Sequence, residues 1–305
     1  MTDLTVDKTH KRKVGWWLGV LILLAPLLTT CTADDFIGTI ATPSAETEIP
    51  ALPIIDMHLH YNEHAWSRYS ASEIITILTE TNVPHALVSS TPDDGTRLLY
   101  DEDPERIVPS LRPYHGQISS GNWFAREESL PYIKERLQTP IYHGIGEFHL
   151  HLSADANSPI VRETARLSVE QGLYLHIHTN ARIVRKIIEL EPDARIIWAH
   201  AGMTEPPSAV ARILSEHPNV WTEISIREHE IAPGGVLDDQ WRDLFLAHPE
   251  RIMIGSDTFV TSRWDHYVQV IDHNRTWLSQ LPSDVAEQIA YKNAARLLEL
   301  GLIDE

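Results

Sequence analysis

The sequence contains little cysteine, few basic residues and only a short apolar run near its start. Cys31 is the only cysteine in 305 residues, so no disulfide within the chain stabilises it and folding must depend on a buried core. Acidic residues outnumber basic residues by 43 to 25, which gives a formal charge of −18. Phosphate backbones are bound through Lys and Arg, so nucleic acid is not an expected partner. The apolar run has about fifteen residues, short for a helix that must cross ~30 Å of hydrocarbon.

The N-terminus has the pattern of an export signal. Lys8, Lys11, Arg12 and Lys13 precede the apolar run at 14–28, and a basic segment before an apolar one is typical of a signal peptide. Leu28-Thr-Thr-Cys31 then resembles a bacterial lipobox, although Thr30 fits less well before the cysteine than Gly, Ala or Ser. We therefore predict a signal peptide at 1–30, lipidation of Cys31 and membrane anchoring.

Two alternatives for the N-terminus stay open, an uncleaved signal anchor and ordinary signal cleavage. Each of them places the remaining chain outside the cytoplasm, in the bacterial cell envelope. Residues 31–50 lack apolar periodicity and are rich in Thr, Ala, Ser and Pro, so they are predicted to form a flexible linker. Without residues 1–30 the chain has 21 basic and 41 acidic residues, a formal charge of −20.

Residues 51–305 are predicted to form one domain, since barrels of the β/α type use about 250 residues as a single unit. Short apolar runs alternate with amphipathic stretches of helical period, as in βαβ units. The predicted strands are 53–60, 85–90, 107–113, 142–149, 173–179, 195–201, 220–226 and 251–257. The predicted helices include 71–81, 126–137, 160–171, 181–190, 208–216 and 237–247, with a further helix at 283–300 that we expect outside the barrel.

An α/β fold of the (β/α)8 TIM-barrel type is favoured over an open doubly wound sheet, which gives a similar alternation. The reason is the position of the unusual residues. His, Glu and Asp repeatedly occupy the C-terminal ends of predicted strands, the rim at which barrel enzymes place their chemistry.

The first strand ends in Asp56-Met-His58-Leu-His60, and alternation puts these three polar side chains on one face. Two imidazoles so placed can ligate one divalent metal, but His-x-His also arises by chance in a chain with 17 His. Four later strands end in metal-competent side chains as well, namely Glu147, His178, His200 and Asp257. Burying so many ionisable groups is costly unless they bind a cation, and this donor set favours zinc or a similar divalent ion.

This ligand pattern resembles the amidohydrolase superfamily, particularly its amidohydrolase-related branch together with the TatD-like and phosphotriesterase-like enzymes. The closing run Ile289-Ala-Tyr-Lys-Asn293-Ala-Ala-Arg296 also resembles that branch, so the resemblance spans roughly 53–300. It implies that His58, His60 and Asp257 hold one metal, that His178 and His200 hold a second, and that Glu147 bridges the two. If Glu147 only supports the ligands, the site holds one metal and His200 is catalytic.

The resemblance implies a hydrolase that uses a metal-activated water on an ester, lactone or amide bond of a small substrate, with Asp257 moving the proton. A metal-dependent decarboxylase of the same superfamily is the main alternative. A non-catalytic ligand-binding surface lipoprotein is a second. DNA hydrolysis is a minor option because of the acidic charge.

Three residues near the predicted site are candidates for substrate binding. His149 continues the face of Glu147, and Arg112 and Arg227 follow the third and seventh strands, where they could bind a substrate anion. A solvated arginine at the rim is the alternative for both arginines. His176, one layer below His178, is expected to support the site rather than ligate a metal.

Overall fold

The computed structural model describes residues 51–301, which lie within one compact unit, Ile49–Glu305. The predicted signal peptide, Cys31 and the linker at 31–50 lie outside the described residues. Among the described helices, none is both long and apolar enough to span a bilayer.

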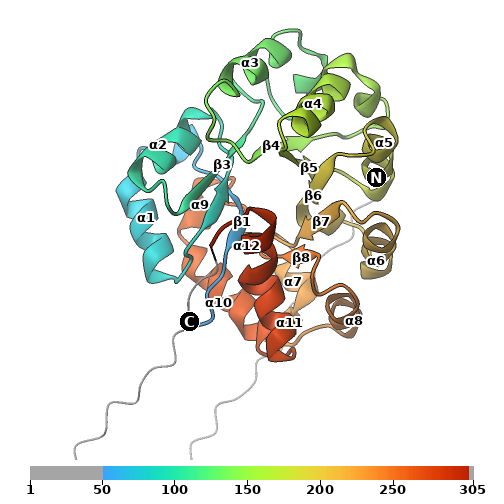
Figure 1. Cartoon of the computed structure of the whole chain (residues 1–305). Coiled ribbons are helices and arrows are strands. Elements are labelled where there is room, and N and C mark those ends of the chain that lie inside the picture. The colour runs from blue at the N-terminus through green and yellow to red at the C-terminus, as the bar shows by residue number, and fades with distance from the viewer. Residues whose placement is uncertain (1–50, 302–305) are drawn as a thin grey trace, which may run out of the picture. The chain divides into compact units, whose positions relative to one another are not determined.

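Eight parallel strands form a sheet in which each strand pairs with the next one in sequence, as Figure 1 shows. The strands are β1 (Asp56–Leu59), β2 (Ala86–Val88), β3 (Ile107–Leu111), β4 (Gly144–His149), β5 (Tyr174–His178), β6 (Arg195–Trp198), β7 (Val220–Glu223) and β8 (Ile252–Met253). The backbone N–H of Met57 donates to the carbonyl of Ile254 at 2.8 Å, and that of Asp257 donates to the carbonyl of His58. These bonds join the first strand to the last, so the sheet closes as a (β/α)8 barrel and not as an open doubly wound sheet.

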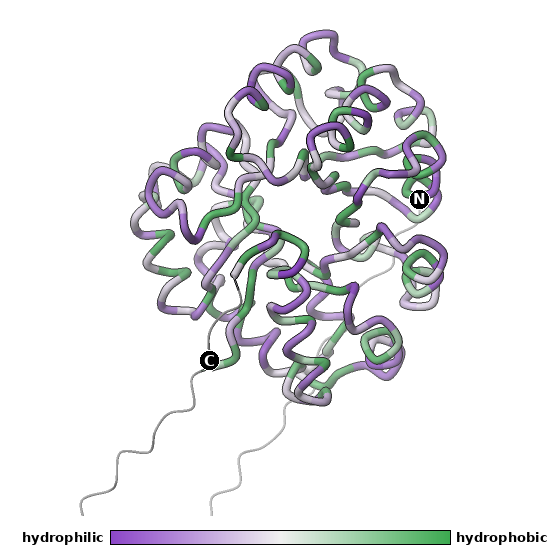
Figure 2. Tube along the Cα trace, viewed as in Figure 1, coloured by the Kyte–Doolittle hydropathy of each residue, from purple (hydrophilic) through white to green (hydrophobic). Residues whose placement is uncertain are grey.

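Helices surround the strands, and hydrophilic stretches dominate their outer turns (Figure 2). The longer ones are α1 (Ala71–Glu80), α2 (Asp94–Glu102), α3 (Ser129–Arg136), α4 (Pro159–Glu170), α5 (Ala181–Leu190), α6 (Pro207–Glu216), α8 (Asp239–Ala247) and α10 (Tyr267–Leu278). Shorter helical segments are α7 (Glu228–Ile231), α9 (Thr261–Trp264), α11 (Ser283–Glu287) and α12 (Asn293–Leu297).

Local sequence signals explain where several helices begin. Ser158 accepts a hydrogen bond from the backbone of Val161 at the start of α4, and Pro159 occupies the first helical position. Asn180 caps α5 in the same way. Both helices begin within one residue of the predicted positions, because short polar caps are encoded locally.

The last predicted strand, 251–257, is only partly a strand. β8 ends at Met253, and Asp257 adopts a left-handed backbone conformation with φ of 49°. The residues after Met253 still follow β1 through the two closing hydrogen bonds, but they bend toward the barrel mouth. The predicted strand therefore continues into the segment that carries Asp257.

The predicted helix at 283–300 is broken into α11, a π-helical segment η6 (Gln288–Lys292) and α12. It packs against the amino ends of the first and last strands. The carbonyl of Ala290 accepts from Ile55, and the side chain of Asn293 donates to the carbonyls of Pro249 and Ile252. The C-terminal helix thus lies outside the strands, as predicted, and covers one end of the barrel.

Candidate metal centre

Six ionisable side chains converge at the carboxyl ends of the strands, and they come from five separate parts of the chain. The six are His58 and His60 at the end of β1, Glu147 on β4, His178 at the end of β5, His200 just after β6 and Asp257 just after β8. Five of them are almost completely buried, and His178 is partly exposed. All six residues that the sequence marked as metal ligands are therefore brought together.

His58, His60 and Asp257 form the first group of potential ligands. The Nε2 atoms of the two histidines lie 3.0 Å apart. Oδ1 of Asp257 lies 3.1 Å from Nε2 of His60 and 3.6 Å from Nε2 of His58. Each residue thus offers one atom to the same small volume, as a ligand set for a single ion requires.

Glu147 connects this group to a second one. Its Oε2 atom lies 3.6 Å from Nε2 of His58 and 3.5 Å from Nε2 of His60. Its Oε1 atom lies 2.9 Å from Nδ1 of His178 and 3.4 Å from Nε2 of His200. One carboxylate oxygen therefore faces each histidine pair, the arrangement that a residue between two ions would need.

The backbone is unusual at two of these positions. His200 and Asp257 have φ values of 55° and 49°, a region that residues other than glycine rarely occupy. In both cases the chain turns sharply at the end of a strand, which aims the side chain back across the barrel mouth. Such conformations cluster at functional sites, where the surrounding structure holds them.

The charges of these groups depend strongly on one another. Burial alone would raise the pKa of Asp257, but His58 and His60 hold this pKa well below its usual range. Burial likewise opposes ionisation of Glu147, yet His149 and His58 hold its pKa well below the ordinary value. Burial would lower the pKa of His58, but Asp257, Glu223 and Glu147 raise it well above the usual value. Without a metal, a proton on His58 therefore balances part of the buried negative charge.

The residues fit a divalent cation, as two buried atoms show. Nε2 of His200 and Oδ1 of Asp257 have no hydrogen-bond partner among the described residues, although both are enclosed by protein. In both His60 and His200, the other ring nitrogen, Nδ1, does have a partner. Nδ1 of His60 contacts the carbonyl of Ser89, and Nδ1 of His200 lies 2.8 Å from Oγ of Ser225. Rings held in this way from behind present Nε2 to the centre, as metal-binding histidines do.

A cavity of about 800 Å3 opens above the six residues. Its walls include Arg112, His149 and Tyr114, together with apolar side chains such as Ile118, Met203 and Phe259. Glu147, His178 and Asp257 reach this cavity. A small molecule in the cavity would therefore meet the potential metal ligands directly.

Two of the three residues predicted to bind substrate line this cavity. The guanidinium of Arg112 donates to Oε2 of Glu147 at 2.8 Å, and its buried Nε has no hydrogen-bond partner among residues 51–301. His149 contacts the Tyr114 hydroxyl through Nδ1 at 3.0 Å, and its ring stacks on that of His178. Burial lowers the pKa of His149 to about 3, so this imidazole is neutral at ordinary pH.

Arg227, the third of these residues, is not among the residues that line the cavity. Its guanidinium donates to the carbonyls of Ala201 and Glu205 and pairs with Glu230 at 2.6 Å, while it packs on the ring of Trp241. The arginine follows β7, as predicted, but Ile226 faces the cavity in its place. Its contacts hold the loop after β7 against the loop after β6.

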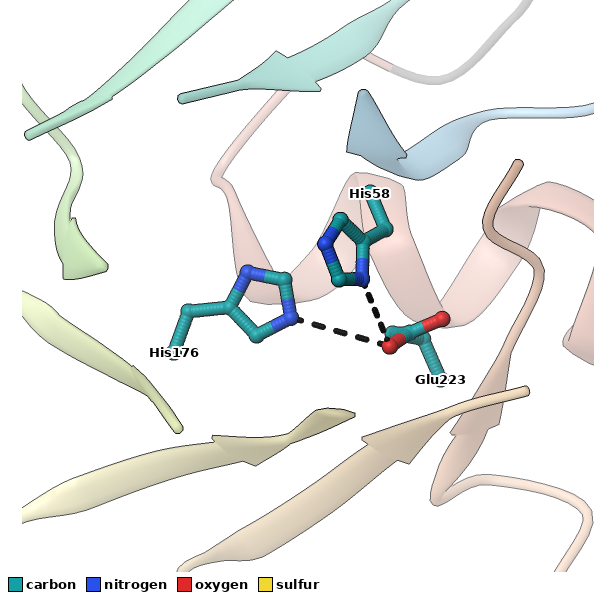
Figure 3. Close-up of side chains that lie close together, drawn as sticks. All are labelled: His58, His176 and Glu223. Atoms are coloured by element: carbon teal, nitrogen blue, oxygen red, sulfur yellow. Dashed lines mark hydrogen bonds and ion pairs between the residues drawn. The ribbon is translucent and has the colours of Figure 1, made fainter. Parts of the chain in front are cut away.

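No pattern in the sequence marked Glu223, the last residue of β7, as part of the site. Figure 3 shows its carboxylate between the rings of His58 and His176, with Oε1 2.9 Å from Nδ1 of His58 and 3.7 Å from Nε2 of His176. The residue ends a strand, as the potential ligands do. This position was the available signal, but the run Val220-Trp-Thr-Glu223 contains no histidine to draw attention to it.

Comparison with known proteins agrees with this geometry. The family model for amidohydrolases matches residues 55–300, most of the chain. The chain belongs to this family. The amidohydrolase superfamily predicted from the ligand pattern is therefore confirmed, and the chain is an enzyme of this superfamily. No curated protein matches this amidohydrolase in sequence.

Solved structures share the fold at low sequence identity. One, from Pseudomonas putida, is named as a putative 2-pyrone-4,6-dicarboxylic acid hydrolase. Its TM-score is 0.59 at 15% sequence identity, and the match covers 82% of this chain and 99% of the P. putida chain. Another is a 5-carboxyvanillate decarboxylase from Sphingomonas paucimobilis, with a TM-score of 0.52, 15% identity and coverage of 82% and 100%. A 5-carboxyvanillate decarboxylase from Novosphingobium aromaticivorans, complexed with manganese and a nitrobenzoic acid, has a TM-score of 0.54, 11% identity and coverage of 81% and 96%.

Proposed function

We propose that this amidohydrolase is a metal-dependent hydrolase that attacks an ester, lactone or amide bond of a small substrate with an activated water. Asp257 carries the proposal. Its carboxylate reaches the cavity, is kept ionised by the neighbouring histidines, and has one oxygen without a hydrogen-bond partner in the described part of the chain. An ionised carboxylate at the boundary between ligands and cavity is placed to take a proton from water and return it to a leaving group.

The metal ligands in this proposal are His58, His60 and Asp257 for one ion, and His178 and His200 for a second, with Glu147 between them. When bound, a divalent ion lowers the pKa of water from about 15.7 toward about 7 and polarises the bond to be cleaved. Imidazole and carboxylate donors favour zinc, whereas one structural neighbour contains manganese, so metal analysis has to decide the identity.

Residues of the chain perform the remaining tasks. Arg112 extends its guanidinium between Glu147 and the cavity, where it can accept an anionic group of the substrate. In the tautomer whose Nδ1 accepts from the Tyr114 hydroxyl, Nε2 of His149 carries a hydrogen that can be donated to the substrate. The apolar wall of Ile118, Met203 and Phe259 would exclude water around the reacting group.

The second candidate function is decarboxylation of a small carboxylic acid. The ion pair between Arg112 and Glu147 favours it, because a carboxylate already paired at 2.8 Å is a weaker bridge between two ions. A site with one metal would result, with Glu147 supporting the ligands and His200 acting on the substrate. Two of the structural neighbours described above are decarboxylases by name.

One experiment separates the two functions. The full-length protein would be purified, its metal content measured, and its activity compared on ester, lactone and amide substrates and on aromatic carboxylic acids, with and without chelator. We expect one or two equivalents of a divalent ion and chelator-sensitive hydrolysis. Release of CO2 with one equivalent of metal would replace hydrolysis by decarboxylation, and full activity of His58→Ala and Asp257→Ala would contradict both.

We also propose that the enzyme acts outside the cytoplasm, anchored to a membrane through lipidated Cys31. The basic residues before the apolar run and the single cysteine directly after it support this location. Labelling of cells with a lipid precursor should mark the wild-type protein and leave Cys31→Ser unmarked. An unlabelled wild type that stays in the membrane would favour an uncleaved signal anchor.

A further inference from the structure

Glu223 is a fully buried carboxylate to which three donors point. Its Oε1 atom lies 2.9 Å from Nδ1 of His58 and accepts from the backbone N–H of His200 at 2.7 Å. Its Oε2 atom accepts from the backbone N–H of Ser225 at 2.8 Å. A buried carboxylate costs much free energy unless such donors satisfy it, and here two of the three contacts go to potential metal ligands.

The contact with His58 decides which ring nitrogen faces the metal centre. An ionised carboxylate can only accept hydrogen bonds, so Nδ1 of His58 must carry the hydrogen that Glu223 receives. Nε2 of the same ring then points to His60 and Asp257, at 3.0 Å and 3.6 Å. In the neutral ring this nitrogen has a free electron pair, which is what a metal ion requires.

The contact with His200 acts on the backbone. His200 has a φ of 55°, and its N–H is directed to Oε1 of Glu223. The other oxygen holds Ser225, whose hydroxyl lies 2.8 Å from Nδ1 of His200. Glu223 therefore holds this histidine directly at its backbone and indirectly at its ring.

The segment after β8 packs closely against this carboxylate at Gly255. A Cβ atom at Gly255 would lie 2.5 Å from Oε2 of Glu223 and 2.8 Å from Cβ of His58. The segment after β8 passes so close that only glycine fits. This close approach lets the carboxylate at the end of β7 pass the segment after β8 and reach His58 on β1.

We infer that Glu223 is a positioning residue of the metal centre: it fixes the orientation of the His58 ring and the backbone of His200, so that both present Nε2 to the cation. The inference rests on the proposed metal-binding function, which it deepens. Glu223 itself lies behind the histidines, and within residues 51–301 no hydrogen bond or ion pair joins it to a residue that lines the cavity.

The test compares the zinc affinity of the full chain with that of Glu223→Gln, measured by competition with a chelator. The amide keeps the size of the side chain but puts an NH2 group against two of the three donors in one orientation, His58 and His200, and against Ser225 in the other. We expect zinc affinity to fall about 10–100-fold, the usual effect of losing a group that orients a metal-binding histidine. Asp93→Asn is the matched control, because Asp93 is an equally buried carboxylate whose hydrogen bonds and ion pairs go to Tyr142, Arg97 and Arg136 and, among the described residues, to none of the ligands.

A second measurement uses the wild type alone, so it does not depend on the variant folding. In the zinc-loaded protein, nitrogen-15 NMR should show His58 coordinated through Nε2, with a hydrogen on Nδ1 that is protected from exchange. Coordination through Nδ1, or zinc affinity of Glu223→Gln within twofold of the wild type, would overturn the inference. Wild-type protein that binds no divalent ion would instead refute the proposed function itself.

Discussion

The two ends of the barrel contain buried polar side chains for different reasons. At the amino end, Asn293 donates to the carbonyls of Pro249 and Ile252, and Asn219 donates to those of Pro192 and Ala194, so the amides satisfy the backbone near the strand starts. At the carboxyl end, Nε2 of His200 and Oδ1 of Asp257 are buried and have no hydrogen-bond partner within residues 51–301. Isolated unpaired atoms also occur at the amino end, on His217 and Arg251, whereas the two at the carboxyl end belong to six converging ionisable side chains and mark a place where a cation fits.

The largest expected effect concerns the carboxyl end. Asp257→Asn should reduce kcat/KM about 10²–10⁴-fold, because the amide cannot take the proton that a general base removes. Steady-state kinetics on the substrate found by the screen would measure this loss. Asp93→Asn, outside the site, serves as the control. An unaltered kcat/KM in Asp257→Asn would show that this carboxylate at the carboxyl end takes no part in the reaction.

Removal of the metal should destabilise the protein as well as inactivate it. Binding to the folded state alone adds free energy of unfolding, about 2.7 kcal/mol when the free ion is at 100 times its Kd. Thermal unfolding with chelator and with added zinc or manganese would show the difference. Identical melting curves, obtained with a protein shown to bind the ion, would mean that the unfolded chain binds the ion as strongly as the folded protein does.

The opposite result is expected at the amino end. Asn293→Ala leaves the carbonyls of Pro249 and Ile252 without their donor, which should lower the free energy of unfolding by about 1–3 kcal/mol. Denaturant unfolding would measure the loss. Activity per folded molecule should stay at the wild-type level, and a drop in kcat at constant metal content would show that the two ends are coupled.

The smallest effect is expected within the cavity. His149→Gln should lower kcat/KM by the value of one hydrogen bond, about 0.5–1.5 kcal/mol, or roughly 2- to 12-fold. Since burial lowers the pKa of His149 to about 3, the ring is neutral from mildly acidic pH upward. The pH profile of kcat/KM between pH 5 and 9 should therefore keep its shape in the variant, and a shifted acidic limb would show that His149 titrates in the wild type.

The sequence predicted the barrel well because its signals are local. Strand positions follow apolar runs, and the starts of α4 and α5 follow capping residues within one residue. The prediction was less accurate for β8, where the chain leaves the strand after Met253. The bend that aims Asp257 inward depends on contacts with β1, which no local pattern contains.

The partners of individual side chains also depend on contacts that no local pattern contains. Arg112 and Arg227 both follow strands and looked alike in sequence, but Arg112 pairs with Glu147 beside the cavity and Arg227 pairs with Glu230 behind it. Glu223 was missed because its role appears only when barrel closure brings the end of β7 within hydrogen-bond distance of His58.

By itself, the sequence determined the alternation of strands and helices, the family, and the six side chains able to hold a metal, because periodicity, strand ends and residue chemistry are written along the chain. Only the tertiary structure decided which atoms face one another: the division of Glu147 between two histidine pairs, the separate fates of Arg112 and Arg227, and the support of His58 by Glu223. The physical reason is that closure of the barrel places residues up to about two hundred positions apart within hydrogen-bond distance, and at that range geometry selects the partner.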